Sequence, residues 1–95
     1  MAELLSDEEI AERLERLEDW SLNDAEDYIE RTIEFGGFLE AIDFISRIAP
    51  LAEAADHHPE IFNVYNRVEL ALSTHDAGGL TDKDFDLAED IDAEV

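Results

Sequence analysis

The chain is 95 residues long, and its 27 aspartates and glutamates against 6 lysines and arginines give a formal net charge of −21 at pH 7. This length allows one modest hydrophobic core, so we expect a single domain over residues 1–95. The negative charge would repel phosphate backbones and anionic lipids, which excludes nucleic acid and membranes as direct partners.

The composition also indicates where the protein works. There is no cysteine, which excludes disulfides and thiol chemistry. No apolar run approaches membrane-spanning length and the start of the chain lacks a secretory signal, so we expect a cytoplasmic protein. Lys83 is the only lysine, and acidic residues are spread along the whole chain. We interpret this as a surface adapted to multimolar salt, in which screening shortens self-repulsion, and we expect a halophilic archaeal source.

A first helix is predicted from about residue 7 to Arg16. Ser6 and Glu9 form a capping-box pattern, in which each side chain satisfies a backbone donor near the other. Ile10, Leu14 and Leu17 then follow with the spacing of one buried stripe. This helix is expected to cover a sheet.

Two strands are predicted next, at 20–22 and 28–35, joined by a polar turn. Apolar and polar residues alternate in the second strand, which is typical of a sheet with one solvated face. The apolar positions are Ile29, Ile33 and Phe35, and the polar ones are Glu30, Thr32 and Glu34. We interpret the pair as a hairpin.

A long helix is predicted over 38–56, after two glycines break the strand. One apolar stripe consists of Phe38, Ala41, Ile42, Ile45, Ile48, Ala49 and Ala52, and a second set consists of Leu39, Phe44 and Leu51. Because one sheet cannot cover both, we expect the second set to face another subunit of a homodimer or homotetramer. Pro50 is expected to kink this helix.

A second hairpin is predicted from strands 61–65 and 67–74. A three-residue loop would pair Val64 with Val68 and place one set of apolar side chains on the core face. That set consists of Phe62, Val64, Val68, Leu70 and Leu72. Thr81 and Asp84 then form another capping pattern, which begins a final helix.

These elements predict an α+β fold in the order α-β-β-α-β-β-α. Four strands would form one antiparallel sheet, with the three helices on one face.

All three histidines lie between residues 53 and 84, two of them adjacent. Imidazole exchanges protons near neutral pH, so this grouping indicates acid–base or ligand chemistry. Pro59 ends the long helix and fixes the direction of His57 and His58. Glu53 precedes His57 by four residues, so we expect its carboxylate to contact that ring on one helical face and fix its tautomer.

The spacing of these residues resembles that of the pterin-4a-carbinolamine dehydratase family. The family pattern is an acidic residue, a His-His-Pro triplet, an aromatic residue, a further histidine and a downstream aspartate. Here it is matched by Glu53, His57, His58, Pro59, Tyr65, His75 and Asp84. The resemblance implies a hydro-lyase that dehydrates 4a-hydroxytetrahydropterin to quinonoid dihydropterin without a bound cofactor or metal.

The resemblance also implies roles for individual residues. His57 and His75 would form the acid–base pair, with Glu53 orienting His57. His58 and Pro59 would border the pterin ring.

Four further positions are candidates for substrate contact. Trp20 is interpreted either as a core residue or as a border of the pterin pocket. Asp84 is either only a helix cap or also a substrate contact. Lys83 stands where the family often has arginine, so it would face the pocket, and Ile61 replaces a common aromatic residue.

Other functions remain open from the sequence. One is a pterin-binding or dimerisation module without this activity, linked to molybdopterin metabolism through a different pterin. Another is a metal site formed by Glu53, His57, His58 and His75. Adjacent histidines at a helix end rarely converge on one ion, so we expect no metal.

Overall fold

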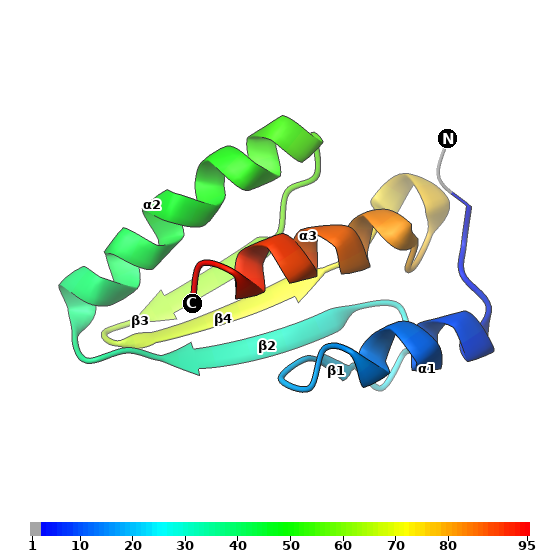
Figure 1. The fold of residues 1–95 in the computed structure, drawn as a ribbon, viewed down its shortest axis with the longest axis horizontal. Helices are drawn as coiled ribbons and strands as arrows, with labels where there is room; N and C mark the ends of the chain where they lie inside the picture. The colour runs from blue at the N-terminus through cyan, green and yellow to red at the C-terminus, as the bar shows by residue number, and fades with distance from the viewer. Residues whose placement is uncertain (1–2) are drawn as a thin grey trace.

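The structure is a computed structural model that describes residues 3–95. Its elements in chain order are α1 (Asp7–Glu15), β1 (Ser21–Leu22), β2 (Ile29–Glu34), α2 (Phe38–Ala55), β3 (Glu60–Val64), β4 (Arg67–Leu72), the short 3₁₀ helix η1 (His75–Ala77) and α3 (Asp82–Asp92). The four strands form an antiparallel sheet in the order β1-β2-β4-β3, with the α-helices against one face (Figure 1). The predicted α+β fold and element order are confirmed.

The core lies between the central strands and the helices. The sheet contributes the buried side chains of Ile29, Ile33, Val68, Leu70 and Leu72. Phe44 and Ile48 of α2, with Phe85 and Ile91 of α3, are each no more than 1% exposed. This packing holds the C-terminal end of β4 and the start of α3 in fixed positions. Among residues 3–95, no helix has the length and apolar character needed to cross a membrane.

The predicted register of the second hairpin is wrong by one residue. Tyr65 and Asn66 form a two-residue turn, so Val64 pairs with Arg67 and Ile61 pairs with Leu70. Tyr65 has a φ of 51°, in the left-handed region that tight hairpin turns require. Because side chains alternate along a strand, the shift moves Phe62 and Val64 to the uncovered face, where they are 56% and 47% exposed.

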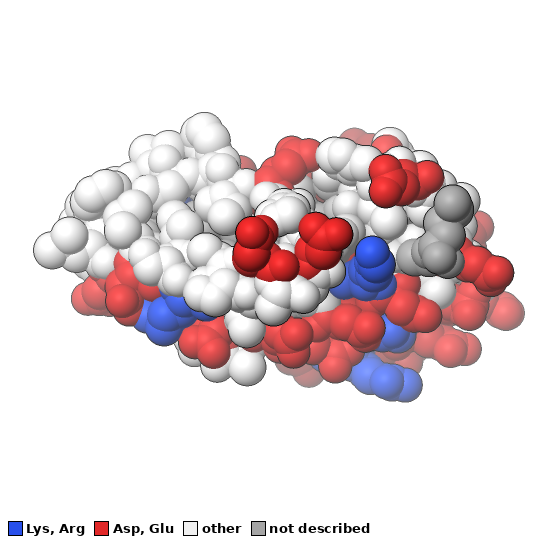
Figure 2. Space-filling view, turned by 90° about the horizontal axis from the view of Figure 1, so that it is seen from above, with Lys and Arg blue, Asp and Glu red and all other residues white. Residues whose placement is uncertain are grey.

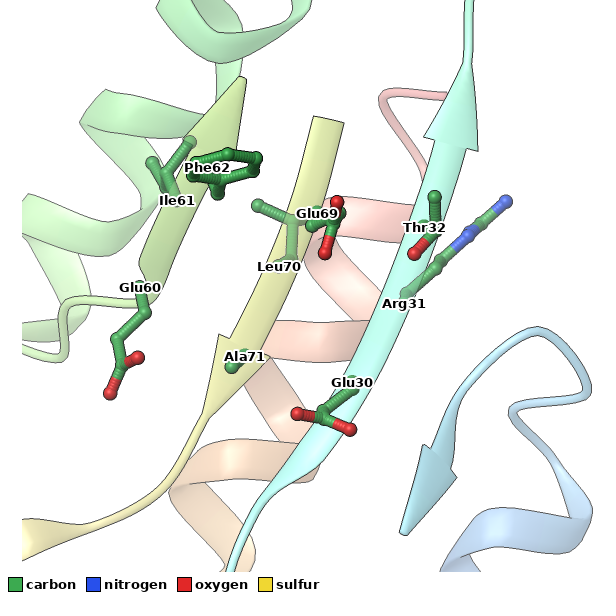
Figure 3. A pocket seen from close by; sticks show the side chains of 9 residues that line it. All are labelled: Glu30, Arg31, Thr32, Glu60, Ile61, Phe62, Glu69, Leu70 and Ala71. Atoms are coloured by element: carbon green, nitrogen blue, oxygen red, sulfur yellow. The ribbon is translucent and has the colours of Figure 1, made fainter. Parts of the chain in front are cut away.

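The sheet face opposite the helices is open. It forms a shallow hollow of about 430 Å³, in which side chains from β2, β3 and β4 lie side by side (Figure 3). Glu30 and Glu60 flank Ala71 in one row across these three strands.

Helix α2 contains the predicted apolar excess, but its buried face differs from the prediction. The core face consists of Ala41, Phe44, Ile48 and Ala52. Phe38, Leu39 and Ile42 are 48%, 81% and 37% exposed, so Phe44 belongs to the core and Phe38 and Ile42 do not. The helix continues past Pro50 to Ala55.

Arg13 joins α1 to α3. Its guanidinium lies 2.9 Å from carboxylate oxygens of Asp82, Asp86 and Glu89, and it stands 5.3 Å above the centre of the Phe85 ring. Hydrogen bonds and charge interactions with Asp86 and Glu89 raise the pKa of Arg13, although its partial burial acts in the opposite direction. One cation thus neutralises part of an acidic helix surface.

We expect Arg13→Met to lower the free energy of unfolding by roughly 1–2 kcal/mol, because both the ion pairs and the cation–π contact are lost. The matched control is Arg16→Met, since Arg16 has no carboxylate within salt-bridge distance among residues 3–95. Urea unfolding of both variants checks this expectation. Equal stability of the two variants would contradict the role given to Arg13.

Candidate active site

The three histidines border one cleft of about 300 Å³. Its lining residues are Asp56, His57, His58, Ser73, Thr74, His75, Asp76 and Lys83. They come from the segment after α2, from the end of β4 with η1, and from the start of α3. The fold therefore brings His75 to the same cleft as His57 and His58, which precede it by 18 and 17 positions.

His57 is buried and pairs with a carboxylate other than the predicted one. Its Nε2 lies 2.5 Å from Oδ1 of Asp84. The predicted contact with Glu53 is wrong, because α2 ends at Ala55 and Asp56 adopts a left-handed conformation with φ of 50°. The chain turns there, so His57 leaves the helical face that carries Glu53.

Glu53 contacts the neighbouring ring instead. Its Oε1 lies 2.8 Å from Nε2 of His58, and both side chains are largely exposed. An exposed pair of this kind contributes about 0–1 kcal/mol to stability. Glu53 is thus placed to orient His58 rather than His57.

Asp84 both caps α3 and holds His57. One oxygen, Oδ2, accepts hydrogen bonds from the Thr81 backbone N–H at 2.9 Å and from the Thr74 hydroxyl at 2.8 Å, and Oδ1 faces His57. The capping box predicted for Thr81 and Asp84 is present. Asp84 is fully buried and does not line the cleft, so it reaches a bound molecule only through His57.

This arrangement fixes the proton position on His57. An ionised carboxylate only accepts hydrogen bonds, so Nε2 of His57 must carry the hydrogen that faces Asp84. Nδ1 is then the ring nitrogen available for proton exchange. Burial strengthens this hydrogen bond, because little water competes for the two groups.

His75 is exposed at the start of η1 and has a different partner. Its Nε2 lies 2.9 Å from the Tyr28 hydroxyl, and the two rings meet edge to face with their centres 6.0 Å apart. Interaction with the Glu60 carboxylate, followed by burial, raises the pKa of Tyr28 above its usual value of 10.0. The hydroxyl therefore stays protonated at neutral pH.

Tyr28 was not among the predicted site residues. Its position two residues before Glu30 indicates that it shares the uncovered sheet face with that residue. Tyr28 and His75 are 47 positions apart in sequence, so their contact depends on how β2 and η1 lie in the folded chain.

The remaining predicted residues divide between the cleft and other parts of the fold. Lys83 lines the cleft. Trp20 is 5% exposed and donates from Nε1 to Asp92 at 2.8 Å. Asp92 is at the opposite end of α3 from Asp84, about 12 Å away along the helix.

Pro59 and Ile61 also lie outside the residues that border the histidine cleft. Ile61 borders the hollow on the open sheet face. In residues 3–95, no three histidine or carboxylate side chains converge as metal ligands would. His57 and His58 are instead held by different carboxylates.

A small α+β domain with three imidazoles around one cleft, each held by a separate partner, is suited to acid–base chemistry on a small molecule. The family model described as pterin 4 alpha carbinolamine dehydratase matches residues 3–94. The chain belongs to this family.

Individual relatives agree with this assignment. A protein from Burkholderia multivorans is 52% identical over 93 residues, covering 98% of this chain and 91% of that protein. One from Chloroflexus aurantiacus is 58% identical over 88 residues, covering 93% and 92%. Both are named as pterin-4-alpha-carbinolamine dehydratases.

A solved structure is also similar over nearly its whole length. The crystal structure of a transcriptional coactivator/pterin dehydratase from Brucella melitensis has a TM-score of 0.91 and 39% identity to this chain. The match covers 95% of this chain and 96% of that one.

Proposed function

We propose that the protein dehydrates 4a-hydroxytetrahydropterin to quinonoid dihydropterin by proton transfer from and to histidine. The observation that carries the proposal is the position of His57 and His75 on one cleft, each with Nε2 held by a separate partner. In the reaction, the carbon–oxygen bond of the carbinolamine breaks and water leaves. A ring nitrogen loses a proton, and its electron pair forms the new carbon–nitrogen double bond.

The two imidazoles divide this work. One protonates the departing hydroxyl, and the other accepts the proton from the ring nitrogen. A positioned acid or base of this kind typically contributes about 10²–10⁴-fold to a rate. We assign His57 as the proton acceptor, because the Asp84 carboxylate in direct contact with it would stabilise the imidazolium that forms.

His58 and Lys83 are proposed to bind the substrate. Both lie at the exposed border of the cleft, where polar groups can orient a flat ring between the two catalytic histidines. Glu53 acts through His58, to which it is hydrogen-bonded. Trp20, Pro59 and Ile61 have no assigned role in this proposal, because none borders the cleft.

The function is tested by following the decay of 4a-hydroxytetrahydropterin in multimolar KCl with and without the protein. Faster decay with formation of the quinonoid product is expected. Unchanged decay in the presence of folded protein would contradict the proposal and favour a different pterin or a binding function. The same assay at low KCl tests salt adaptation, since unscreened repulsion among the 27 acidic residues should lower the folded fraction.

We also propose that a second copy of the chain covers the outer surface of α2. Phe38, Leu39 and Ile42 are exposed there, and the surface over α2 is largely free of acidic side chains in the view of Figure 2. In a chain of net charge −21, such an apolar area favours contact with protein rather than water. The Brucella melitensis structure is that of a coactivator as well as a dehydratase, so a protein partner is the alternative occupant.

We expect Leu39→Glu to shift the protein from an oligomer to a monomer. A charge placed in an apolar contact must be desolvated without a partner, which costs several kcal/mol. Light scattering coupled to size exclusion measures the change. Ala11→Glu on the exposed side of α1 is the control and should leave the oligomer intact. A monomeric wild-type protein would contradict self-association and favour the alternative partner.

A further inference from the structure

Thr74 directly precedes His75 and is almost fully buried, with 7% of its surface exposed. Its hydroxyl lies 2.8 Å from Oδ2 of Asp84 and 2.7 Å from the hydroxyl of Thr81. The other oxygen of Asp84 faces His57. The residue next to one imidazole of the cleft is thus in contact with the carboxylate that holds another.

The direction of each hydrogen bond in this network follows from counting donors and acceptors. Oδ2 of Asp84 accepts from the Thr81 backbone N–H, and an ionised carboxylate also accepts from the Thr74 hydroxyl. Because a hydroxyl has one proton, the Thr74 oxygen must accept from the Thr81 hydroxyl. The Thr81 oxygen in turn accepts from the backbone N–H of Lys83 at 3.3 Å. The proton of the Thr74 hydroxyl is therefore used on Asp84 and not on a molecule in the cleft.

The backbone of Thr74 fixes the segment that carries His75. Its carbonyl oxygen accepts hydrogen bonds from the N–H groups of Ala77, Gly78 and Gly79. Its own N–H donates to the Gly79 carbonyl at 2.9 Å. These bonds close the turn that contains η1, in which His75 is the first residue. Thr74 thus links the end of β4, η1 and the start of α3.

We propose that Thr74 is a positioning residue that ties the segment of His75 to the carboxylate that holds His57, and so fixes the two imidazoles relative to each other. Its hydroxyl anchors Oδ2 of Asp84, which leaves Oδ1 directed at Nε2 of His57. The effect of Thr74 on the rate rests on the proposed function, whereas its effect on the His57 ring does not.

Thr74→Val tests this role, because it removes the hydroxyl and keeps the shape of the side chain. A carbon atom approaches an oxygen only to roughly 3.3–3.6 Å, whereas the Thr74 hydroxyl lies at 2.8 Å. The valine must therefore displace the Asp84 carboxylate. Proton and nitrogen-15 NMR of the His57 ring measures the result. We expect one slowly exchanging Nε2–H signal in the wild type, and in Thr74→Val a shifted signal that exchanges faster with water.

Two further substitutions control this measurement. Thr74→Ser keeps the hydroxyl and should keep the wild-type His57 signal. Thr32→Val makes the same chemical change at an exposed position of β2 and should also leave the signal unchanged. If Thr74→Val does not fold, Thr74→Ala removes the same hydrogen bond without pressing a methyl group against the carboxylate.

Kinetics give a second measurement. Thr74→Val should lower kcat for dehydration about tenfold with little change in KM, because a small misplacement of the reacting groups affects the transition state more than binding. In an Asp84→Asn background the same substitution should lower kcat by about twofold at most, since the effects of residues in one hydrogen-bond network are not additive.

The outcomes separate the positioning role from the proposed function. An unchanged His57 signal in Thr74→Val would overturn the role whether or not the protein is a dehydratase. A changed signal that Thr74→Ser restores would support the role, and an inactive wild type would then contradict only the proposed function. An equal loss of kcat in the wild-type and Asp84→Asn backgrounds would overturn the proposal that Thr74 acts through Asp84.

Discussion

Replacing His75 with alanine is expected to lower kcat for dehydration by about 10²–10⁴-fold, the usual contribution of one general acid or base. His75 is exposed and contributes nothing to the buried core. Its removal should therefore leave the unfolding temperature nearly unchanged, and stopped-flow measurement of the dehydration rate isolates the chemical effect.

His58→Ala is the matched comparison for this variant, because His58 is also an exposed imidazole of the cleft. If His58 only binds the substrate, its loss should raise KM more than it lowers kcat. A His75→Ala variant with an unchanged kcat would remove His75 from the acid–base pair. His57→Ala is less informative alone, since it also leaves the buried Asp84 without its partner.

Replacing Asp84 with alanine is expected to have the largest effect on stability. Its carboxylate is fully buried and accepts hydrogen bonds from His57, Thr74 and the Thr81 backbone. Removing one partner of a buried pair costs about 3–5 kcal/mol, because the remaining groups stay buried without their hydrogen bonds. For a domain of this size, this loss lowers the unfolding temperature by roughly 15–30 °C. Calorimetry measures it directly.

Asp84→Asn separates the two functions of this side chain. The amide oxygen can still accept from the Thr81 backbone and cap α3, so the loss of stability should be smaller, about 1–3 kcal/mol. The amide nitrogen, however, only donates, and facing Nε2 of His57 it would favour the opposite tautomer. We expect kcat to fall by at least tenfold. An Asp84→Asn variant with full activity would show that the tautomer of His57 is unimportant.

Much of the fold could be predicted because its signals are local. The two capping boxes, at Ser6 with Glu9 and at Thr81 with Asp84, are present as predicted. The predicted alternation of buried and exposed residues along β2 is also present, since Ile29 and Ile33 are buried and Glu30 is exposed. Each of these patterns depends on residues within a few positions of one another, so no tertiary information was needed.

The register of the second hairpin depended on one backbone angle. Tyr65 adopts a left-handed conformation in a two-residue turn. Tight turns of this kind usually contain glycine or an Asn-Gly pair, and Tyr-Asn gave no such signal. The prediction therefore placed Phe62 and Val64 on the wrong face of the sheet.

The partners of the histidines could not be predicted for a similar reason. Spacing along a helix placed Glu53 beside His57, but the left-handed Asp56 ends α2 between them. The actual partners, Asp84 and Tyr28, are 27 and 47 residues away from the histidines that they contact. Contacts between such distant positions depend on how β4, η1 and α3 pack together. The three histidines and Lys83 nevertheless border one cleft.

The most direct test of the central proposal is the single-turnover dehydration rate of the wild type beside the His57→Ala/His75→Ala double variant, both in multimolar KCl. Both imidazoles border one cleft, so under this proposal we expect the wild type to accelerate dehydration strongly and the double variant to approach the uncatalysed rate. Equal rates for the wild type and a folded double variant would contradict the proposal that these two histidines catalyse the reaction.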